Sequence, residues 1–236
     1  MPIRSERRDE VVLLTIDRPE RRNALDLDHC HDLADAVATA DDARVVVVTG
    51  AGGHFCAGAD LSGVEDEHFV AALRRLLLAI CDLPAPVVAA VEGAALGAGM
   101  QLAIACDLRV ARPDATFGIP AAKLGLMIDR WSVQRLVAMA GDGPTRAMLL
   151  AAEVLSGEEA HRLGLVQRTG GIDDAMAWAE EISRLAPLSI AGHKLALNEA
   201  TDDEFGIAFG RAWTSDDVAE GMAAFRERRP PQFRGQ

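Results

Sequence analysis

Two glycine-containing segments of this 236-residue chain carry backbone groups that could do chemistry. Residues 56–61 read CAGADL, and residues 97–101 read GAGMQ, between an apolar run typical of a buried strand and one typical of a helix. Glycine lets the backbone approach a ligand closely, and the first N–H groups of a helix have no acceptors within it. N–H groups from the two segments could together stabilise a carbonyl oxygen that gains negative charge. Alternatively, these glycines only let a strand and a helix pack tightly.

Three other kinds of site lack the residues they need. The segment at 97–101 has no third glycine of a dinucleotide fingerprint, and no phosphate-binding G-x-x-x-x-G-K-[ST] loop occurs in the chain. A serine hydrolase would have no visible nucleophile, because no G-x-S-x-G elbow is present. The six histidines show no metal-ligand spacing, so we predict no metal and no cofactor. Only His54, beside the first glycine segment, is worth testing.

The charge balance limits the partners. The net charge of −12, from 24 basic and 36 acidic residues, creates a field that repels phosphates, so we expect no nucleic-acid partner. Two groups of arginines could still bind an anion locally or form solvated faces: Arg18, Arg21 and Arg22, and Arg226, Arg228 and Arg229.

We also expect a cytoplasmic protein without membrane insertion. No apolar run reaches the roughly 20 residues of a membrane-spanning helix, and the N-terminal residues lack the apolar stretch of a secretion signal. Four widely spaced cysteines without a C-x-x-C pair predict buried thiols.

Strands and helices must position the glycine segments. Short β-branched runs bounded by Gly, Pro or Asp predict buried strands at 11–16, 45–49, 87–91 and 106–110. Helices are predicted between them at 26–40, with Asp26 as N-cap, at 67–81, with an apolar stripe through Val70, Leu73, Leu77 and Ile80, and at 100–105. This alternation indicates an α/β core. Later segments all read as helices, at 130–140, 144–151, 156–163, 173–185, 189–200, 204–213 and 216–228.

Five motifs, in order along nearly the whole chain, carry a resemblance to a known family. They are residues 18–25 (RPERRNAL), 55–61 (FCAGADL), 93–99 (GAALGAG), 106–111 (CDLRVA) and 220–225 (EGMAAF). Through them the chain resembles the crotonase superfamily of enoyl-CoA hydratases and isomerases. With residues 128–132 (IDRWS) and 229–233 (RPPQF), it is most similar to an actinobacterial subgroup that lacks both catalytic glutamates and is linked to mycolic-acid and fatty-acid metabolism.

The resemblance implies an α/β fold, with a crotonase-type spiral of ββα turns over residues 1–185. A helical C-terminal region, 186–236, would pack on the core and on neighbouring subunits of a homotrimer or hexamer. The backbone N–H groups of Ala59 and Ala98 would hold the carbonyl oxygen of an acyl-CoA thioester. The remaining CoA contacts implied by the resemblance are Arg22, Ala24, Ala57, Asp60, Leu61, Phe225 and Arg228, with Phe209 lining the same region.

The chain departs from this family at the two positions that matter for hydration. Hydratases of the family place glutamates where Gln101 and Ala121 stand here. Gln101 cannot titrate and could only orient a water or a ligand, and Ala121 has no polar group. Each positioned acid or base typically contributes roughly 100- to 10,000-fold, so efficient hydration is not expected. The resemblance places both residues in the acyl pocket, and Trp131 belongs either to that pocket or to the core.

One carboxylate remains a candidate catalyst. Asp129 aligns with an aspartate that some dienoyl-CoA isomerases of the family use for proton transfer. A double-bond shift can run on one carboxyl group, because that group can take a proton and return it elsewhere. Alternatively, Asp129 pairs with Arg130 or caps the helix that begins there.

Two hypotheses from different classes follow. The first is an acyl-CoA-binding protein on an enzyme scaffold, which carries long acyl-CoA towards fatty-acid synthesis enzymes with little or no hydratase activity. The second is an active isomerase or weak hydratase that uses Asp129. A purely structural trimer without a ligand is the third reading.

Overall fold

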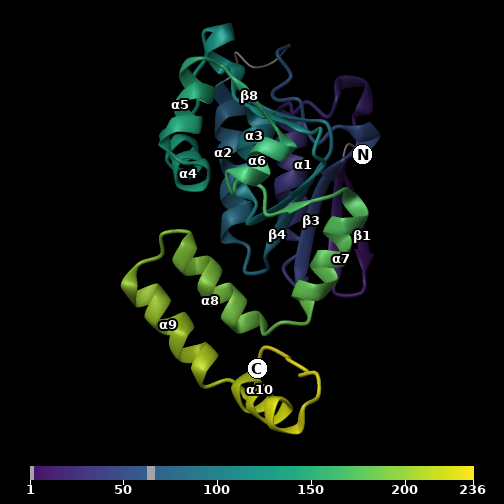
Figure 1. The fold of residues 1–236 in the computed structure, drawn as a ribbon, viewed down its shortest axis with the longest axis vertical. Helices are drawn as coiled ribbons and strands as arrows, with labels where there is room; N and C mark the ends of the chain where they lie inside the picture. Colours follow the sequence, from purple (N-terminus) through teal and green to yellow (C-terminus); the bar gives the residue numbers. More distant parts are fainter. Residues whose placement is uncertain (1–2, 63–66) are drawn as a thin grey trace.

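Six strands form the main sheet in the computed structural model, which describes residues 3–62 and 67–236 (Figure 1). The sheet order is β1-β2-β3-β4-β6-β9, in which β1 pairs antiparallel with β2 and the later pairs are parallel. The bounds are β1 Ile3–Arg8, β2 Val11–Ile16, β3 Val45–Gly50, β4 Val87–Val91, β6 Leu108–Ala111 and β9 Arg168–Thr169. The central strands are continuous apolar runs because both faces of the sheet are covered.

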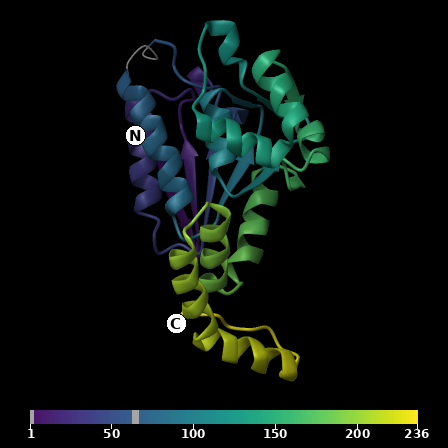
Figure 2. The same ribbon diagram turned by 90° about the vertical axis from the view of Figure 1, so that its left-hand side faces the viewer.

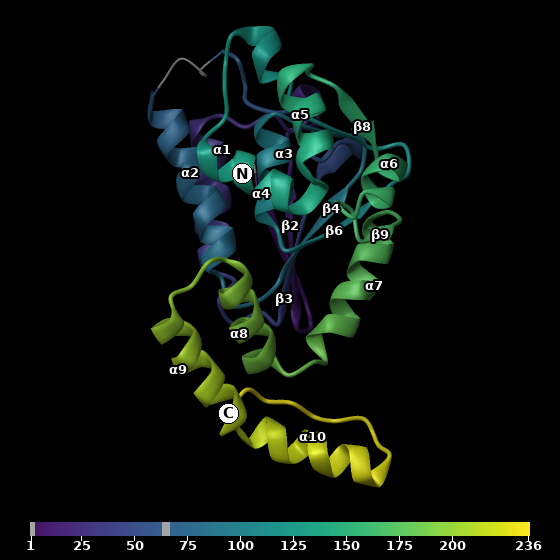
Figure 3. The same ribbon diagram turned by 60° about the vertical axis from the view of Figure 1, so that its left-hand side comes forward.

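Helices cover both faces of this sheet (Figures 2 and 3). One face packs on α1 (Leu27–Ala38), α2 (Glu67–Asp82) and α3 (Ala98–Ala105), and the other packs on α7 (Ile172–Ser183). Successive residues of β3 therefore enter different cores: Val46 and Val48 pack towards α1 to α3, and Val45 and Val47 pack towards α7.

A second, smaller sheet holds β5 (Ala94–Leu96), β7 (Thr116–Gly118) and β8 (Val154–Ser156), in the order β5-β7-β8. The chain passes from the main sheet to the small sheet and then into a helix, first as β4–β5–α3 and again as β6–β7–α4 (α4, Arg130–Ala140). This repeated order confirms the predicted spiral of ββα turns. Isolated bridges extend the small sheet from Ala95 to Cys56 and pair Ala59 with Leu25.

Three helices follow the core at its lower end in Figure 1, away from α3. They are α8 (Pro187–Leu197), α9 (Asp202–Trp213) and α10 (Asp216–Glu227). Lys194 connects α8 to the core. Its buried ammonium donates to the carbonyls of Ile80 and Ala85 at 2.9 Å and lies 2.8 Å from Asp107 Oδ2. The predicted boundary at residue 186 coincides with the start of α8, and the division into two regions stays a prediction.

These three helices expose an unusual amount of apolar surface. The residues that are more than half exposed include Leu197, Ile207, Phe209, Trp213, Met222 and Phe225. Large apolar side chains exposed close together commonly mark interaction sites.

The remaining elements are α5 (Asp142–Leu150), α6 (Gly157–Arg162) and the short 3₁₀ helices η1 (Pro19–Arg21), η2 (Ala51–Gly53) and η3 (Pro120–Leu124). The ten helices predicted from the sequence all occur within the described residues, with ends shifted by at most three positions. The predicted strand at 106–110 begins too early, because Cys106 is the C-cap of α3 and the Asp107 carboxylate accepts from the Val87 N–H. No described helix is long and apolar enough to cross a bilayer.

The predicted apolar stripe of α2 is wrong at one residue. Val70 is 61% exposed, whereas the buried face of α2 runs through Phe69, Leu73, Leu77 and Ile80. Phe69 takes the place on the inner face that the sequence pattern had given to Val70, so Val70 is left at its edge.

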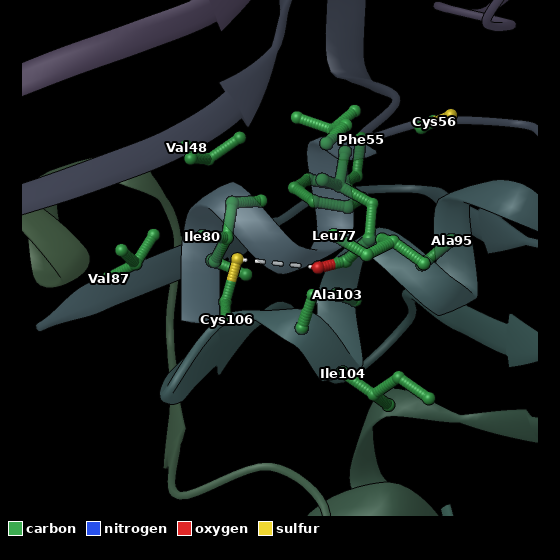
Figure 4. Close-up of a cluster of buried hydrophobic side chains, with 14 of the residues drawn as sticks. Val48, Phe55, Cys56, Leu77, Ile80, Val87, Ala95, Ala103, Ile104 and Cys106 are labelled. Atoms are coloured by element: carbon green, nitrogen blue, oxygen red, sulfur yellow. Dashed lines mark hydrogen bonds between the residues drawn. The ribbon is translucent and has the colours of Figure 1, made fainter. Parts of the chain in front are cut away.

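The four cysteines are buried and free, as predicted. Figure 4 shows Cys56 and Cys106 among the apolar side chains of the core, with the Cys106 thiol donating to the Leu102 carbonyl at 3.4 Å. Burial raises the pKa of Cys30, Cys56 and Cys106 to about 12. These thiols therefore remain protonated and do not act as nucleophiles.

Candidate active site

The two glycine segments meet in the structure. The Cys56 N–H donates to the Ala94 carbonyl at 2.8 Å, and the Leu96 N–H donates back to the Cys56 carbonyl at 3.0 Å. A short strand-like pairing thus sets the turn at Gly58 beside the start of α3. The close approach predicted from the glycines is present.

Glycines are required at this junction for two different reasons. Gly97 has φ +53° and ψ −117°, a backbone conformation that a side chain makes strongly unfavourable. Gly99 has an ordinary φ, but a Cβ on it would lie 2.1 Å from the Cys56 carbonyl oxygen. A Cβ on Gly58 would lie 4.0 Å from the Ala98 nitrogen, which places the turn that precedes Ala59 directly against Ala98. Tight packing and a ligand site are therefore not alternatives here, because the packing brings the two segments together.

The N–H groups of Ala59 and Ala98 are both available. Within residues 3–62 and 67–236, neither group donates to an acceptor of the protein. Ala98 is the first residue of α3, so its N–H has no partner in the helix. Its neighbours Gly97 and Gln101 do have partners, the Gly118 and Gly97 carbonyls. Two unpaired donors on adjoining backbone segments are what an oxyanion site requires.

The opposite end of α3 is satisfied by two arginines. Arg109, which is fully buried, donates to the carbonyls of Ala103 and Cys106, and Arg135 donates to those of Ile104 and Ala105. Burial lowers the pKa of Arg109 to about 10, so it keeps its charge at neutral pH. Positive charge at the C-terminal end of a helix opposes the negative end of its dipole. The N-terminal end at Ala98, by contrast, carries a helix donor without an acceptor among the described residues.

Gln101 lies in a cluster with Asp129 and Ser132. Its Nε2 donates to Asp129 Oδ2 at 3.0 Å and to Ser132 Oγ at 2.8 Å, while Ser132 Oγ donates to Asp129 Oδ2 at 2.7 Å. Asp129 also caps α4, because its Oδ1 accepts from the Ser132 N–H at 3.1 Å. The capping alternative for Asp129 is confirmed, and the same carboxylate lies beside Gln101. Sequence reasoning did not single out Ser132.

The charge partner of Asp129 is Arg74 of α2, not Arg130. Arg74 Nη1 lies 3.5 Å from Asp129 Oδ1, so the two form an ion pair, but Nη1 makes no hydrogen bond. The guanidinium carbons of Arg74 and Arg135 lie 5.0 and 5.3 Å from the ring centroid of Trp131, within cation–π range. Trp131 is half-buried against the core, so it links α2 to α4, and its lining of an acyl pocket stays a prediction.

Ala121 lies in η3 and packs partly against the core. The segment that follows it towards Asp129 exposes Leu124, Leu126 and Met127, the last to 90%. The Ala121 carbonyl accepts a hydrogen bond from the Leu126 N–H at 3.0 Å. The methyl group of Ala121 offers no proton donor or acceptor to the site.

Around the first motif, structural contacts occupy most polar groups. Asn23 is fully buried, its Nδ2 donates to the carbonyls of Ala51 and His54, and its Oδ1 accepts from the Arg18 N–H. Arg22 is exposed, with φ +50°, and its carbonyl accepts from the Ala57 N–H at 3.0 Å. These bonds bring the segment holding Arg22 and Ala24 to the segment 57–61, and their part in a CoA site stays a prediction.

Asp60 is buried and already paired. Its Oδ1 accepts from the hydroxyl of Ser62 at 2.7 Å and from the Ser62 N–H at 3.1 Å, and Arg18 lies 2.8 Å from its Oδ2. The bonds from Ser62, with the nearby Arg18, lower the pKa of Asp60 to about 2. Leu61, by contrast, is 56% exposed beside it.

Phe225 and Arg228 do not join the rest of the site within one chain. They lie on and directly after α10, at the end of the molecule opposite α3 in Figure 1, and Phe225 is 83% exposed. Phe209, on α9, stacks at 5.9 Å from Phe205 and 5.8 Å from Trp213. These residues could reach a ligand at Ala59 and Ala98 only on a neighbouring copy.

His54 has a structural position. Its Nδ1 accepts from the Ala94 N–H at 3.3 Å and its carbonyl accepts from Asn23, so it holds β5 beside the first segment. Among the described residues no group of three histidine, cysteine, aspartate or glutamate side chains could hold a metal ion.

Comparison with known proteins gives this site a family. The sequence model described as Enoyl-CoA hydratase/isomerase matches residues 6–236. The chain is 46% identical over 238 residues to "Probable enoyl-CoA hydratase echA6" of Mycobacterium bovis, with 96% of this chain and 97% of the relative covered. The solved structure of an enoyl-CoA hydratase from Bacillus anthracis has a TM-score of 0.91 and 29% identity, and the match covers 100% of both chains. The chain therefore belongs to the enoyl-CoA hydratase/isomerase family, with mycobacterial relatives as its resemblance implied.

Proposed function

We propose that the protein binds acyl-CoA thioesters and carries them towards fatty-acid synthesis enzymes in the cytoplasm, with little or no hydratase activity. The observation that carries the proposal is the pair of N–H groups at Ala59 and Ala98, which have no acceptor among the described residues, with Gln101 and Ala121 at the positions where hydratases of the family carry glutamates. Both donors are backbone groups, so the thioester carbonyl can be held whatever the surrounding side chains are. Curated relatives described as enoyl-CoA hydratases support the choice of ligand class.

Hydration of a 2-enoyl thioester needs a base for the water and an acid for the α-carbon. The amide of Gln101 cannot exchange a proton with substrate at neutral pH, and Ala121 carries only a methyl group. Without these two groups, each contributing roughly 100- to 10,000-fold, only the acceleration that the oxyanion site itself supplies would remain. The thioester would therefore be bound and polarised without being hydrated.

Asp129 supports a second candidate function, a double-bond isomerase or weak hydratase. Its carboxylate is 37% exposed and bonded to Gln101, so it lies at the same site. However, its two oxygens already receive hydrogen bonds from Gln101, from the Ser132 hydroxyl and from the Ser132 N–H. A base that takes a substrate proton would have to give up or share these bonds, and this favours the binding function.

A second copy of the chain would complete the CoA site under this proposal. Exposed apolar residues of α8 to α10 give a surface through which copies could associate as a trimer or hexamer. Association would allow Phe225 and Arg228 of one copy to approach the adenine end of CoA bound to another. The two arginine groups near the ends of the chain would then face the phosphates of the ligand.

The experiment that tests the proposed function is calorimetric titration with palmitoyl-CoA, run beside hydration and isomerisation assays on crotonyl-CoA and a 3-enoyl-CoA. Binding without turnover is the expected result. Turnover at ordinary enzyme rates would transfer the assignment to the Asp129 isomerase, and absence of binding would leave a structural oligomer without a ligand.

A further inference from the structure

A cavity of about 380 Å³ lies where the core meets the C-terminal helices. Its wall comes from the residues before β3, the turn before β4, the segment that joins α7 to α8, and the segment after α10. This last segment returns to the start of α8, since a Cβ on Gly235 would lie 2.9 Å from Pro187 Cγ (Figure 3). Ala59 and Ala98 do not line the cavity, and neither do exposed apolar residues such as Phe209. The cavity is therefore distinct from the proposed thioester site and from the proposed association surface.

Most of the cavity wall is apolar. The uncharged side chains that line it include Pro84, Pro86, Ile182, Leu185, Leu188 and Ile190. A cavity of a few hundred Å³ with mainly apolar walls and a small number of polar groups is typical of sites for small organic molecules. The wall therefore fits a ligand with an apolar body.

The charged side chains on the same wall are mainly cationic. They are Arg44, Arg211, Arg234 and Asp41. Among the described residues, the side chains of Arg211 and Arg234 have neither a carboxylate within ion-pair distance nor a hydrogen-bond acceptor. The cavity thus has a local excess of positive charge in a chain whose net charge is −12. This excess favours an anionic ligand.

Arg44 is fixed in the wall but not fully paired. Its Nη2 donates to the Phe233 carbonyl at 2.6 Å, and its Nε lies 3.9 Å from Glu10 Oε2. Its Nη1 is enclosed and has no acceptor among the described residues. An unpaired donor on an enclosed cationic group costs free energy, and an acceptor on a ligand would offset that cost. Arg211 and Arg234 are exposed, so their long side chains are free to turn towards the same ligand.

We propose that this cavity binds a small organic carboxylate with an aliphatic body, of the size of a medium-chain fatty acid. Guanidinium groups recognise carboxylates through paired N–H donors, and the apolar wall covers the chain. A bare inorganic anion uses the arginines but leaves the apolar wall in water, so it fits less well. Arg44 belongs to the core, Arg211 to α9 and Arg234 to the segment after α10. A bound carboxylate therefore joins these three parts of the chain and strengthens their packing.

Octanoate is the probe, titrated by calorimetry into the intact protein in the presence of excess palmitoyl-CoA. Octanol, which has the chain without the charge, and inorganic phosphate, which has charge without the chain, are titrated beside it. Octanoate is expected to bind about tenfold or more tightly than either. Arg211→Met and Arg234→Met should each weaken octanoate binding by about fivefold. Arg162→Met, at an exposed arginine of α6 outside the cavity, is the matched control and should leave the affinity unchanged.

Amide hydrogen exchange locates the bound octanoate, which should slow exchange in α9 and in residues 228–236. Equal affinity for octanoate and octanol, phosphate binding as tight as that of octanoate, or unchanged affinity in both arginine variants would each overturn the proposal. Displacement of octanoate by palmitoyl-CoA would also overturn it, because the octanoate would then occupy the thioester site. Both variants replace exposed side chains, so they are expected to fold. A protein that binds octanoate but not palmitoyl-CoA would keep this site and lose the proposed function.

Discussion

Gln101 Nε2 lies 3.0 Å from Oδ2 of Asp129, and this hydrogen bond joins the helix that offers the free Ala98 N–H to the residue that begins α4. The bond holds both side chains in a fixed arrangement and engages the carboxylate that the isomerase hypothesis names as the base. Two carboxylates at this place would repel each other at neutral pH, whereas the Gln101 amide donates a hydrogen bond to the Asp129 carboxylate. The glutamine is therefore part of a stable polar cluster.

Asp129→Asn should leave acyl-CoA affinity within about twofold of wild type and produce no change in turnover, because the proposed function uses no base. Asparagine is as good an N-cap as aspartate, so α4 should form normally. Calorimetry with palmitoyl-CoA and the isomerase assay check this together. If the protein is an isomerase, the same variant should instead lose roughly 100- to 10,000-fold in kcat. Asp142→Asn, at an exposed ion pair with Arg146, is the control.

Restoring the missing acid–base groups should create hydratase activity. The variant Gln101→Glu with Ala121→Glu and Asp129→Asn replaces both absent carboxyls and removes the charge that would face the new one at 101. We expect crotonyl-CoA hydration to rise by about 100-fold or more over wild type, and Gln101→Glu with Asp129→Asn alone to give a smaller gain. The loss of the enoyl absorbance measures the rate. A folded variant that binds crotonyl-CoA without any gain would show that these two positions are not the reason for low activity.

Gly99→Ala should weaken the protein and its ligand binding together. The new Cβ would lie 2.1 Å from the Cys56 carbonyl oxygen, so α3 must move away from the segment that carries Ala59. Such a clash in a packed interior typically costs about 1–3 kcal/mol, and the two N–H groups would no longer converge. Thermal unfolding and palmitoyl-CoA titration measure the two effects.

Gly143→Ala is the control for this substitution. Gly143 lies in α5, where a Cβ would meet nothing within 4 Å, and alanine is the better helix former. Its expected effect is a melting temperature equal to or slightly above wild type, with unchanged affinity. A fall in melting temperature similar to that of Gly99→Ala would contradict the steric argument.

Asp60 should contribute to the loss of folded-state stability at low pH. Its pKa is lowered from 3.8 to about 2 in the folded protein, chiefly by the hydrogen bonds from Ser62. A group whose folded pKa is depressed contributes stability above its unfolded value, and this contribution is lost as the pH falls from about 3.8 towards 2. Asp60→Asn should therefore flatten the fall in melting temperature across that window. An unchanged slope would mean that the contacts of Asp60 with Ser62 and Arg18 carry no net stabilisation.

Ile207→Glu should disrupt self-association. Ile207 is 74% exposed in α9, so a glutamate there stays solvated within one copy and is costly only where an assembly buries it. Sedimentation of the wild-type protein as a trimer or hexamer, and of the variant as smaller species, is the expected pair of results. A wild-type protein that sediments as a monomer would remove the route by which Phe225 and Arg228 approach CoA.

The main sheet could be predicted from the sequence because its central strands are buried on both faces. Runs such as Val45 to Val48 contain no polar residue, so the sequence does not suggest a loop there. β1 was not predicted, since its residues are mostly charged and it exists through its pairing with β2 at the sheet edge. The three-residue strands β5, β7 and β8 are also too short to show a period.

The backbone donors of the candidate site could be predicted from the residues alone, whereas Gln101 and Asp129 were predicted only through the family resemblance. Gly58 and Gly97 identify their segments through a conformation that the residue type reveals. Ser132 and Arg74 gave no such signal, because Ser132 meets Gln101 of α3 across 31 residues of sequence and Arg74 of α2 meets Asp129 across more than fifty. Spatial neighbours of this kind have no spacing rule within a single chain. The positions of Phe225 and Arg228 on the far helix were equally unpredictable, since an assembly surface leaves no local pattern.

The two unpaired donors belong to peptide bonds, and this has a consequence for how such a protein can change over time. Under the proposed function, small residues other than proline at positions 59 and 98 would supply the same N–H, so such substitutions would leave the contact with the thioester oxygen in place. The side chains around it, such as Gln101 and Ala121, can be exchanged one at a time while that grip persists. Chemistry can therefore be gained, altered or lost on this scaffold through one or two replacements, and a descendant that no longer turns over its ligand can still hold it.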